Sequence, residues 1–300
     1  MSPIPSNLEE LRRRIDEIDD RLQDLLIERF ELVLDVAAQK RGGSVNPHQP
    51  AREAEIIRRM VARNRRPLQA ETLVRMWREM IAGTTRLQGN FRIAVYAPPE
   101  APGLWDIARD HYGSHTAMQG YQSAGAVIRT VSEGQAEIGV LPMPQEGEPD
   151  PWWRMLASND GQAARVIARL PFGASGNTRN GRTSALAIGR GVRQPTGHDR
   201  TLIAAEIAPD ISRGRIFALL TSLGLEGTFL ASCSQANGAN ILIELSGFVE
   251  LGDPRLQRLR AQLGQELFGL VELGGYAEPL QLDAAPARPI TTADPVAARG

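Results

Sequence analysis

The first forty residues carry a heptad pattern, and it constrains the fold more than any other feature of the chain. Apolar residues recur at alternating steps of three and four: Leu8, Leu11, Ile15, Ile18, Leu22, Leu25, Leu32 and Val36. This spacing predicts a helix with an apolar stripe along one side. With Ser6 as its N-cap and Gly42-Gly43 as its stop, the helix would run for about 35 residues. No other segment of residues 1–90 reaches that length, so we expect the stripe to pack against its own copy in a homodimer.

Arg29 interrupts the stripe, and a charge there is unfavourable unless it is paired. One interpretation is a residue that fixes the dimer register by pairing with an acid of the partner chain. The other is an arginine directed into a cavity that binds an anion. Lys40 follows on a face within about 20° of Arg29 and about 16 Å along the axis. Arg12 lies about 25 Å from Arg29 and about 100° around the helix, so it could reach only a site of the partner chain.

Lys40 is the single lysine among the 34 lysine and arginine residues of the chain. An ammonium group is a compact donor, whereas guanidinium is a broad planar fork. A retained lysine therefore suits a buried single-atom target such as an ether oxygen. The alternative is a chance survivor at a helix end, where cations are mildly favoured.

Composition excludes several classes of protein. A net charge of −1 and a pI near 6.5 do not favour a nucleic-acid partner. The single cysteine, Cys233, cannot form an internal disulfide, and the four scattered histidines predict no metal site. We find no signal segment and no apolar run long enough to span a bilayer, so we expect a cytoplasmic protein without a membrane partner.

Two shorter helices are predicted after the Pro-containing linker 46–50. One resumes near Ala51 and carries Arg52 and Glu53 in its first turn. The other runs from about Gln69 to Leu87 and places Thr84 and Gln88 one turn apart near its end. Its expected apolar face consists of Leu73, Met76, Trp77, Met80 and Ile81.

Residues 8–90 resemble the all-helical chorismate mutase domain that opens bacterial P-proteins. The matching positions are Leu11-Arg12-x-x-Ile15, Glu28-Arg29, Lys40, Arg52-Glu53, Thr84 and Gln88. The resemblance implies an intertwined homodimer with two sites, each of which borrows Arg12 from the partner chain. It also implies chorismate as the substrate, no cofactor, and a place in aromatic amino acid biosynthesis.

Chorismate carries two carboxylates and an enol ether, and its rearrangement to prephenate needs no nucleophile or general base. The resemblance implies that Arg12 and Arg29 hold the carboxylates, while Lys40 and Gln88 donate to the ether oxygen. It also implies that Glu53 accepts a hydrogen bond from the ring hydroxyl.

Three further positions complete the implied mutase site. By the resemblance, Arg52 and Thr84 add carboxylate and wall contacts. Gln49 stands where the enteric form of the family has an aspartate near the hydroxyl. An amide oxygen still accepts a hydrogen bond, so we expect this departure to weaken binding modestly rather than abolish it.

The remaining chain is predicted to be β-rich. Residues 91–96 and 136–141 are apolar runs typical of buried parallel strands, with a helix expected over 123–133. The stretch 131–142 resembles the prephenate dehydratase domain that follows the mutase in P-proteins. From Arg200 the predicted order is βαββαβ, with helices over 211–223 and 254–263 and strands over 228–233, 240–245 and 268–273. This order resembles an ACT regulatory domain, and Gly274-Gly275-Tyr276 resembles its usual ending.

The functional motifs of the prephenate dehydratase and ACT families are absent from their expected places. Residues 97–100 (APPE) replace a Gly-rich turn with a hydroxyl residue, and residues 143–146 (MPQE) lack the next hydroxyl residue. The Thr-Arg-Phe triplet falls at 183–185 (TSA) or is displaced to 178–180 (TRN). The ACT phenylalanine motif is replaced by residues 231–234 (ASCS). The segment between Pro142 and Thr183 is also too short for the second lobe of the family, so we do not expect dehydratase activity.

The sequence thus predicts a multidomain chain. An all-α, three-helix, intertwined dimeric mutase domain spans residues 1–90. A truncated α/β dehydratase-like region (91–197), an α+β ferredoxin-like (βαββαβ) ACT-like domain (198–281) and a disordered tail (282–300) follow. The predicted function is chorismate mutase with a catalytically degenerate C-terminal half. The alternatives are a non-catalytic dimeric regulator that senses a small molecule, and a bifunctional mutase–dehydratase.

Overall fold

The computed structural model describes residues 7–40, 48–65, 67–157, 163–173, 176–179, 181, 183–235 and 237–282. Three helices open the chain: α1 (Leu8–Lys40), α2 (Pro50–Arg63) and α3 (Ala70–Gln88). They lie close to the ranges predicted from periodicity. The expected cap Ser6 and stop Gly42-Gly43 lie outside the described residues. The Asn7 side chain accepts a hydrogen bond from the Glu9 amide at 3.1 Å, which is an N-cap interaction.

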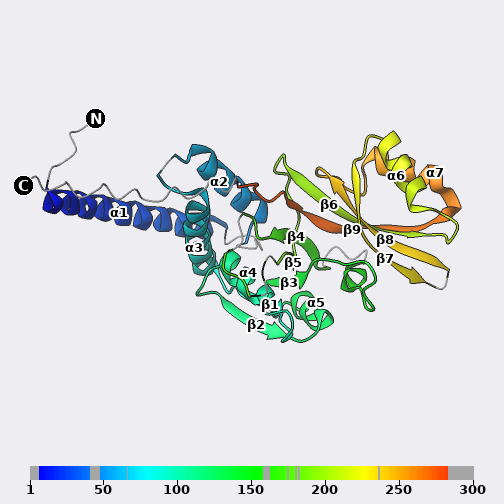
Figure 1. Ribbon diagram of the computed structural model, residues 1–300, viewed down its shortest axis with the longest axis horizontal. Helices are drawn as coiled ribbons and strands as arrows, with labels where there is room; N and C mark the ends of the chain where they lie inside the picture. Colours follow the sequence, from blue (N-terminus) through cyan, green and yellow to red (C-terminus); the bar gives the residue numbers. More distant parts are fainter. Residues whose placement is uncertain are drawn as a thin grey trace, which may run out of the picture.

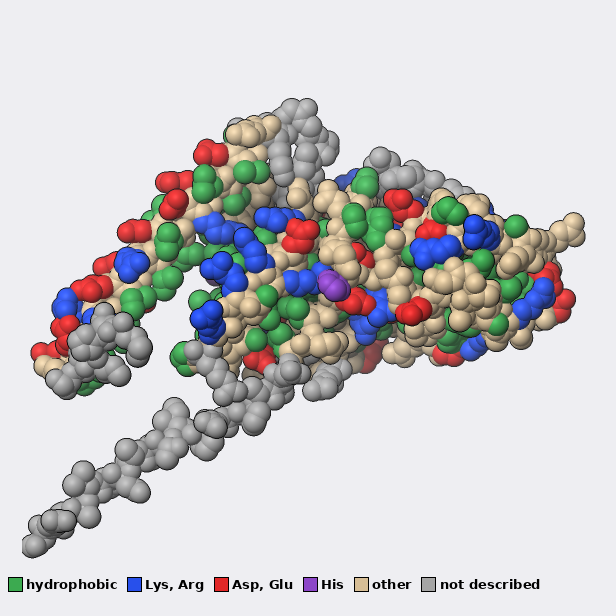
Figure 2. Space-filling view, turned by 90° about the horizontal axis from the view of Figure 1, so that it is seen from above, with side chains coloured by type: hydrophobic (Ala, Val, Ile, Leu, Met, Phe, Trp, Pro, Cys, Tyr) green, Lys and Arg blue, Asp and Glu red, His purple; other side chains and the backbone are tan. Residues whose placement is uncertain are grey.

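Helix α1 projects from the rest of the molecule as a single long rod (Figure 1). Its heptad residues are exposed, with Leu11 at 39% and Leu8 at 61% as the extremes. Figure 2 shows hydrophobic side chains along the rod beside a row of acidic ones. The helix packs on α3, where Phe30 lies against Gly83. Most of the apolar stripe is therefore uncovered within the described part of this single chain.

Helices α2 and α3 pack on each other and on the following domains. Their shared core contains Ile57, Val74, Ile81 and Phe172. The apolar face predicted for α3 is partly wrong, because Met76 is 58% exposed. The buried face is rotated toward Val74 and Ala82, since α3 packs on the end of α4. Ala82 approaches Gly113 so closely that a Cβ at position 113 would lie 2.6 Å from it.

A nine-stranded sheet follows, in the order β2-β1-β3-β5-β4-β9-β6-β8-β7. In its first half, β1 (Arg92–Tyr96) lies between β2 (Ala117–Tyr121) and β3 (Ile138–Pro142), all three parallel. Strands β5 (Ala185–Gly189) and β4 (Arg165–Leu170) continue antiparallel. Helices α4 (Gly103–Tyr112) and α5 (Ala124–Ser132) and the short η1 (Trp152–Leu156) complete this lobe. The strands expected over 91–96 and 136–141 and the helix over 123–133 are confirmed, whereas β2, β4, β5 and α4 were not foreseen.

The second half of the sheet has the expected βαββαβ order. It comprises β6 (Asp199–Ile207), α6 (Arg213–Ser222), β7 (Gly227–Gln235), β8 (Gly238–Ser246), α7 (Pro254–Leu263), η2 (Gly264–Glu266) and β9 (Leu267–Ala277). Helices α6 and α7 contribute to a separate apolar core over these strands. The two halves join where β4 lies parallel to β9 at Val166 and Gly274. Gly274 has φ 112°, and a Cβ there would lie 2.2 Å from the Val166 carbonyl oxygen, so this junction requires glycine.

Arg58 of α2 ties the helices to the sheet. Its Nη1 donates to Thr196 Oγ1 at 2.8 Å, and its Nη2 donates to the carbonyl oxygens of His198 and Glu278 at 2.9 Å each. These acceptors lie just before the start of β6 and just beyond the end of β9. Helices α2 and α3 therefore share a core with the C-terminal two thirds of the chain, and Arg58 of α2 adds polar contacts to it.

Truncation after Asn90 tests this coupling. Every candidate mutase residue lies within residues 1–90, but the fragment loses Phe172 from its core and all three acceptors of Arg58. Exposing one buried apolar side chain costs about 1.5–3 kcal/mol. We expect the helical signal of the fragment to melt at a lower temperature than in the full chain, with higher binding of an apolar dye. Equal melting temperatures by circular dichroism would contradict the coupling.

Candidate active site in the N-terminal helices

Arg29 lies where α1 crosses α3. Its guanidinium carbon is 5.4 Å from the centre of the Trp77 ring, and the side chain is half-buried. Burial lowers the pKa of Arg29, although a guanidinium stays charged at neutral pH. Its Nη1 is buried without a hydrogen-bond partner among the described residues. A charged donor in that position is best satisfied by an anion, because the planar guanidinium group can donate two parallel hydrogen bonds to a carboxylate.

Thr84 and Gln88 lie on the same side of α3 as Trp77. They follow it by seven and eleven residues, which places each of them within about 20° of Trp77 around the helix. The buried Thr84 hydroxyl donates to the Ile81 carbonyl at 2.8 Å, and Gln88 Nε2 donates to the Thr84 carbonyl at 3.1 Å. The structure thus brings Arg29, Thr84 and Gln88 to one side of α3. Lys40 is the last residue of α1, and its side chain lies outside the described residues.

Glu53 lies at the contact between α2 and α3, around the helix from Trp77. Its Oε2 accepts a hydrogen bond from Arg78 Nη1 at 3.0 Å. Its Oε1 lies 3.5 Å from His48 Nε2. All three side chains are buried, with Glu53 only 8% exposed. Glu53 is therefore held in a buried ion pair on the face of α3 next to that of Arg29.

The other predicted site residues are dispersed in the single chain. Arg52 is exposed and pairs with Glu55 at 3.0 Å. Arg12 is exposed on the projecting part of α1. Gln49, next to the first residue of α2, lines a cavity of about 500 Å³ between α2 and the two halves of the sheet. The cavity is also lined by Arg190, Arg193, Phe248 and Tyr276. The roles of Arg12, Gln49 and Arg52 thus stay predictions.

Sequence reasoning missed a buried polar cluster behind Glu53. His48 lies against Phe91 and Tyr112, with ring centroids 5.5 and 5.6 Å apart, and His111 lies 4.7 Å from Tyr112. Burial lowers the pKa of His48, holds that of His111 well below its ordinary value and raises that of Tyr112. Arg78 gave no signal in the sequence, because an arginine on an amphipathic helix normally faces solvent. Only the packing of the lobe around it makes this position distinctive.

Residues 11–89 match the family model described as chorismate mutase type II. Over these residues the chain is similar to chorismate mutase type II domains. The chain is also similar to two enzymes named bifunctional chorismate mutase/prephenate dehydratase. The one from Pseudomonas aeruginosa is 30% identical over 146 residues, covering 47% of this chain and 40% of the relative. The one from Aquifex aeolicus is 29% identical over 140 residues, covering 45% and 38%. The match thus spans well under half the length of these relatives.

Two solved structures are similar to this chain over more than half of its length. Prephenate dehydratase from Streptococcus mutans has a TM-score of 0.44 and 14% identity, covering 64% of this chain and all of that one. The enzyme from Arthrobacter aurescens, in complex with L-Phe, has a TM-score of 0.45 and 13% identity, covering 65% and 93%. Likeness at this level carries no information about activity.

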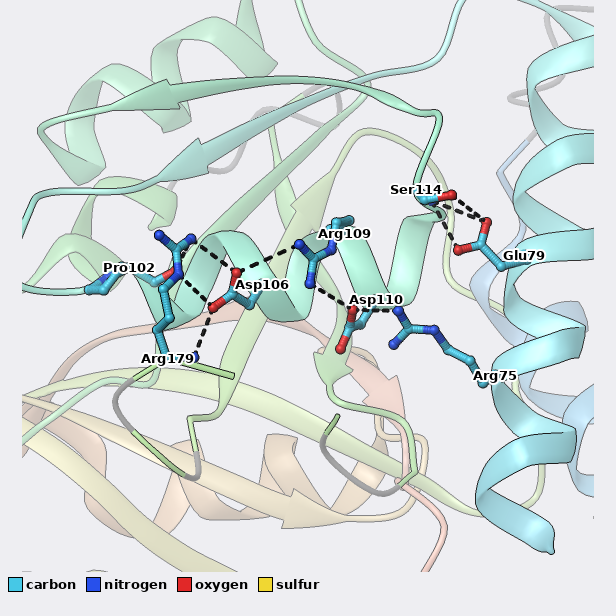
Figure 3. Close-up of polar contacts among 8 residues, drawn as sticks. All are labelled: Arg75, Glu79, Pro102, Asp106, Arg109, Asp110, Ser114 and Arg179. Atoms are coloured by element: carbon cyan, nitrogen blue, oxygen red, sulfur yellow. Dashed lines mark hydrogen bonds and ion pairs between the residues drawn. The ribbon is translucent and has the colours of Figure 1, made fainter. Parts of the chain in front are cut away.

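The acidic residues of helix α4 pair with arginines of the same chain. Figure 3 shows acids of α4 bound to arginines on either side. Asp106 accepts from Arg179 Nε at 2.9 Å and Nη2 at 3.0 Å, and these bonds are the first cause of the lowered pKa of Asp106. Asp110 pairs with Arg75 of α3 at 2.8 Å. Arg179, the arginine of the displaced triplet, is therefore neutralised by the chain itself.

The Thr hydroxyls of both candidate triplets are also engaged. Thr178 and Thr183 donate to the Gly181 carbonyl. Among the described residues, no group of three His, Cys, Asp or Glu side chains could hold a metal ion. Within the same residues, no helix is long and apolar enough to cross a membrane.

The buried side chains of His48 and His111 predict a loss of stability in acid. Their folded pKa values lie below the ordinary value of 6.5. As the pH falls through 6.5, the unfolded chain binds protons that the folded chain does not, so the free energy of unfolding decreases. The slope is up to about 1.4 kcal/mol per pH unit for each histidine, and stability from this source is complete above about pH 7.5.

Urea unfolding between pH 7.5 and 5.5 measures this loss. The variant His111→Gln should show a shallower loss of stability than wild type, because one buried histidine no longer titrates. The exposed His115 provides the control, and His115→Gln should keep the wild-type slope. The same slope in His111→Gln and wild type would exclude a neutral, buried His111.

Proposed function

We propose that this chain is a homodimeric chorismate mutase that rearranges chorismate to prephenate in aromatic amino acid biosynthesis. The observation that carries the proposal is the half-buried Arg29 over Trp77, on the side of α3 that holds Thr84 and Gln88. Its Nη1 is buried and has no hydrogen-bond partner among the described residues. It lies inside the segment that matches the mutase family. A paired structural arginine would have an acid beside it, whereas this one is poised for an anion.

The rearrangement suits such a site. A C–O bond breaks as a C–C bond forms within one molecule, so the protein must hold a compact conformer and stabilise charge on the ether oxygen. Arg29 would bind one carboxylate through its planar fork. Gln88 and Lys40 would donate to the ether oxygen, and Thr84 would form part of the wall. This chemistry needs no cofactor.

Glu53 would accept a hydrogen bond from the ring hydroxyl. Its Oε2 is taken by Arg78, which leaves Oε1 as the acceptor. Arg52, one residue earlier on α2, would add a carboxylate contact. Gln49 would supply an amide in place of an aspartate, which weakens hydroxyl binding modestly.

The second carboxylate would be held by Arg12 of a partner chain. In one chain Arg12 lies about 25 Å along α1 from Arg29, too far to share one small ligand. The exposed heptad stripe of α1 supports a dimer, because an apolar stripe of this length is normally covered by a second helix. In an antiparallel or interleaved dimer, Arg12 of one chain would reach the site of the other.

For the C-terminal half we propose an ACT-like βαββαβ domain and a dehydratase-like lobe without dehydratase activity. The internal pairing of Arg179 and the missing hydroxyl residues at 97–100 and 143–146 support this. The relatives are named bifunctional, so a second activity is the alternative that an assay must address. We propose a cytoplasmic location, in keeping with such metabolism.

The deciding experiment follows chorismate by ultraviolet absorbance and identifies the product. Accumulating prephenate supports the mutase proposal. Phenylpyruvate as the product formed from chorismate would favour the bifunctional alternative. A folded dimer that does not consume chorismate would favour the non-catalytic regulator.

Replacing Lys40 tests its role as a single-atom donor. Lys40→Arg keeps the charge but puts a broad fork where a compact ammonium is needed, so kcat should fall by about 10²-fold or more. Melting temperature and dimer mass should be unchanged. Turnover near that of wild type would identify Lys40 as a chance survivor at a helix end.

Mixing two inactive variants tests the shared site. Homodimers of Arg12→Ala and of Arg29→Ala should each be nearly inactive. A heterodimer of the two has one site with both arginines intact, so subunit exchange should restore up to about half of the wild-type turnover per heterodimer. Exchange is confirmed by mass spectrometry of differently tagged chains. Confirmed heterodimers without activity would rule out a site built from two chains.

A further inference from the structure

The ion pair between Glu53 and Arg78 is enclosed by three parts of the chain. Arg78 of α3 is 4% exposed, and its Nη1 lies 3.0 Å from Glu53 Oε2 on α2. Its guanidinium carbon lies 5.1 Å from the ring centre of Phe172, which follows β4. Phe172 is itself 5% exposed, so a side chain of the α/β lobe closes one side of the pair.

A second contact with the lobe lies on the other side of Glu53. His48, which precedes α2, faces Glu53 Oε1 at 3.5 Å and packs on Phe91 and Tyr112. Phe91 precedes β1, and Tyr112 ends α4. Both oxygens of Glu53 are therefore approached by side chains that the lobe holds in place.

We propose that Arg78 is a positioning residue for Glu53 in the mutase reaction, and that the dehydratase-like lobe holds Arg78 in place through Phe172. This inference rests on the proposed function and adds a residue that the sequence did not single out. It also gives the lobe a task in the mutase domain that needs no chemistry of its own.

The physical reason is the cost of burying an isolated carboxylate. With Arg78 present, Oε2 is fixed by a charge-assisted hydrogen bond, and Oε1 remains an acceptor at a defined place. Without Arg78, the buried Glu53 would be left as an uncompensated charge, which is strongly unfavourable. It would take up a proton or turn away, and either change removes the acceptor for the substrate hydroxyl.

A double-mutant cycle in kcat and KM separates positioning from mere support. Arg78→Met should lower kcat by about 10-fold or more with a smaller change in KM, and Glu53→Gln should do the same. Because both changes disable the same group, the double variant should be within about 2-fold of Glu53→Gln. Arg78→Lys can still donate to Oε2, so it should recover part of the loss.

Arg75→Met is the matched control. Arg75 lies one turn earlier on α3 and also ties that helix to the lobe, through Asp110 at 2.8 Å, but does not contact Glu53. Its loss should leave kcat within about 2-fold of wild type. Two results would refute the proposal and leave Arg78 with a purely structural role. One is an equal loss of kcat in Arg75→Met and Arg78→Met. The other is a double variant in which the effects of Arg78→Met and Glu53→Gln multiply.

Two further measurements keep the test decisive. Should Arg78→Met not fold, the cycle is run with Arg78→Lys, and Phe172→Leu tests the lobe. Phe172→Leu should lower kcat less than Arg78→Met does, and an unchanged kcat would remove the lobe from the proposal. Should wild type not consume chorismate, the proposed function fails, whereas the same cycle in melting temperature still reports whether Glu53 and Arg78 are coupled. Additive losses there would also refute the pairing.

Discussion

The buried pair of Glu53 and Arg78 is the interaction on which the junction of this molecule depends. Two charges that leave water must meet each other in good geometry, and the surrounding groups must hold them there. Glu53 comes from α2, Arg78 from α3, and Phe172 and Tyr112 from the α/β lobe. No one of these parts can be moved without exposing or isolating a charge. Helices α2 and α3 and the first half of the sheet therefore meet around this pair.

Helix α1 stands in contrast to that unit. Its apolar heptad residues are exposed, and much of the helix projects from the rest of the molecule (Figure 1). Arg29 and Phe30 contact α3 at Trp77 and Gly83. A stripe of leucines and isoleucines that is exposed in one chain is suited to bury itself in another. The chain thus combines a rigid junction with an extended arm. Arg29 lies where the two meet, half-buried over Trp77.

The elements that sequence reasoning located have strong local signals. Period and prolines placed α1, α2 and α3, and continuous apolar runs placed β1 and β3. Strand β2 was missed because its residues are exposed or half-buried at the edge of the sheet, so it carries no apolar run. The face of α3 was misjudged at Met76, because the position of a neighbouring helix, not the period alone, decides which side is buried.

The sequence by itself determined the composition of the candidate site: the arginine inside the heptad stripe, the single lysine, and Thr84 with Gln88 one turn apart. These follow from helical geometry, which is local and regular. Only the tertiary structure decided that Glu53 would pair with Arg78, that His48 would be buried against Phe91, and that β4 would join β9 at Gly274. Such contacts join residues far apart in the chain. Their energies depend on burial and on close approach, which no local pattern of residues records.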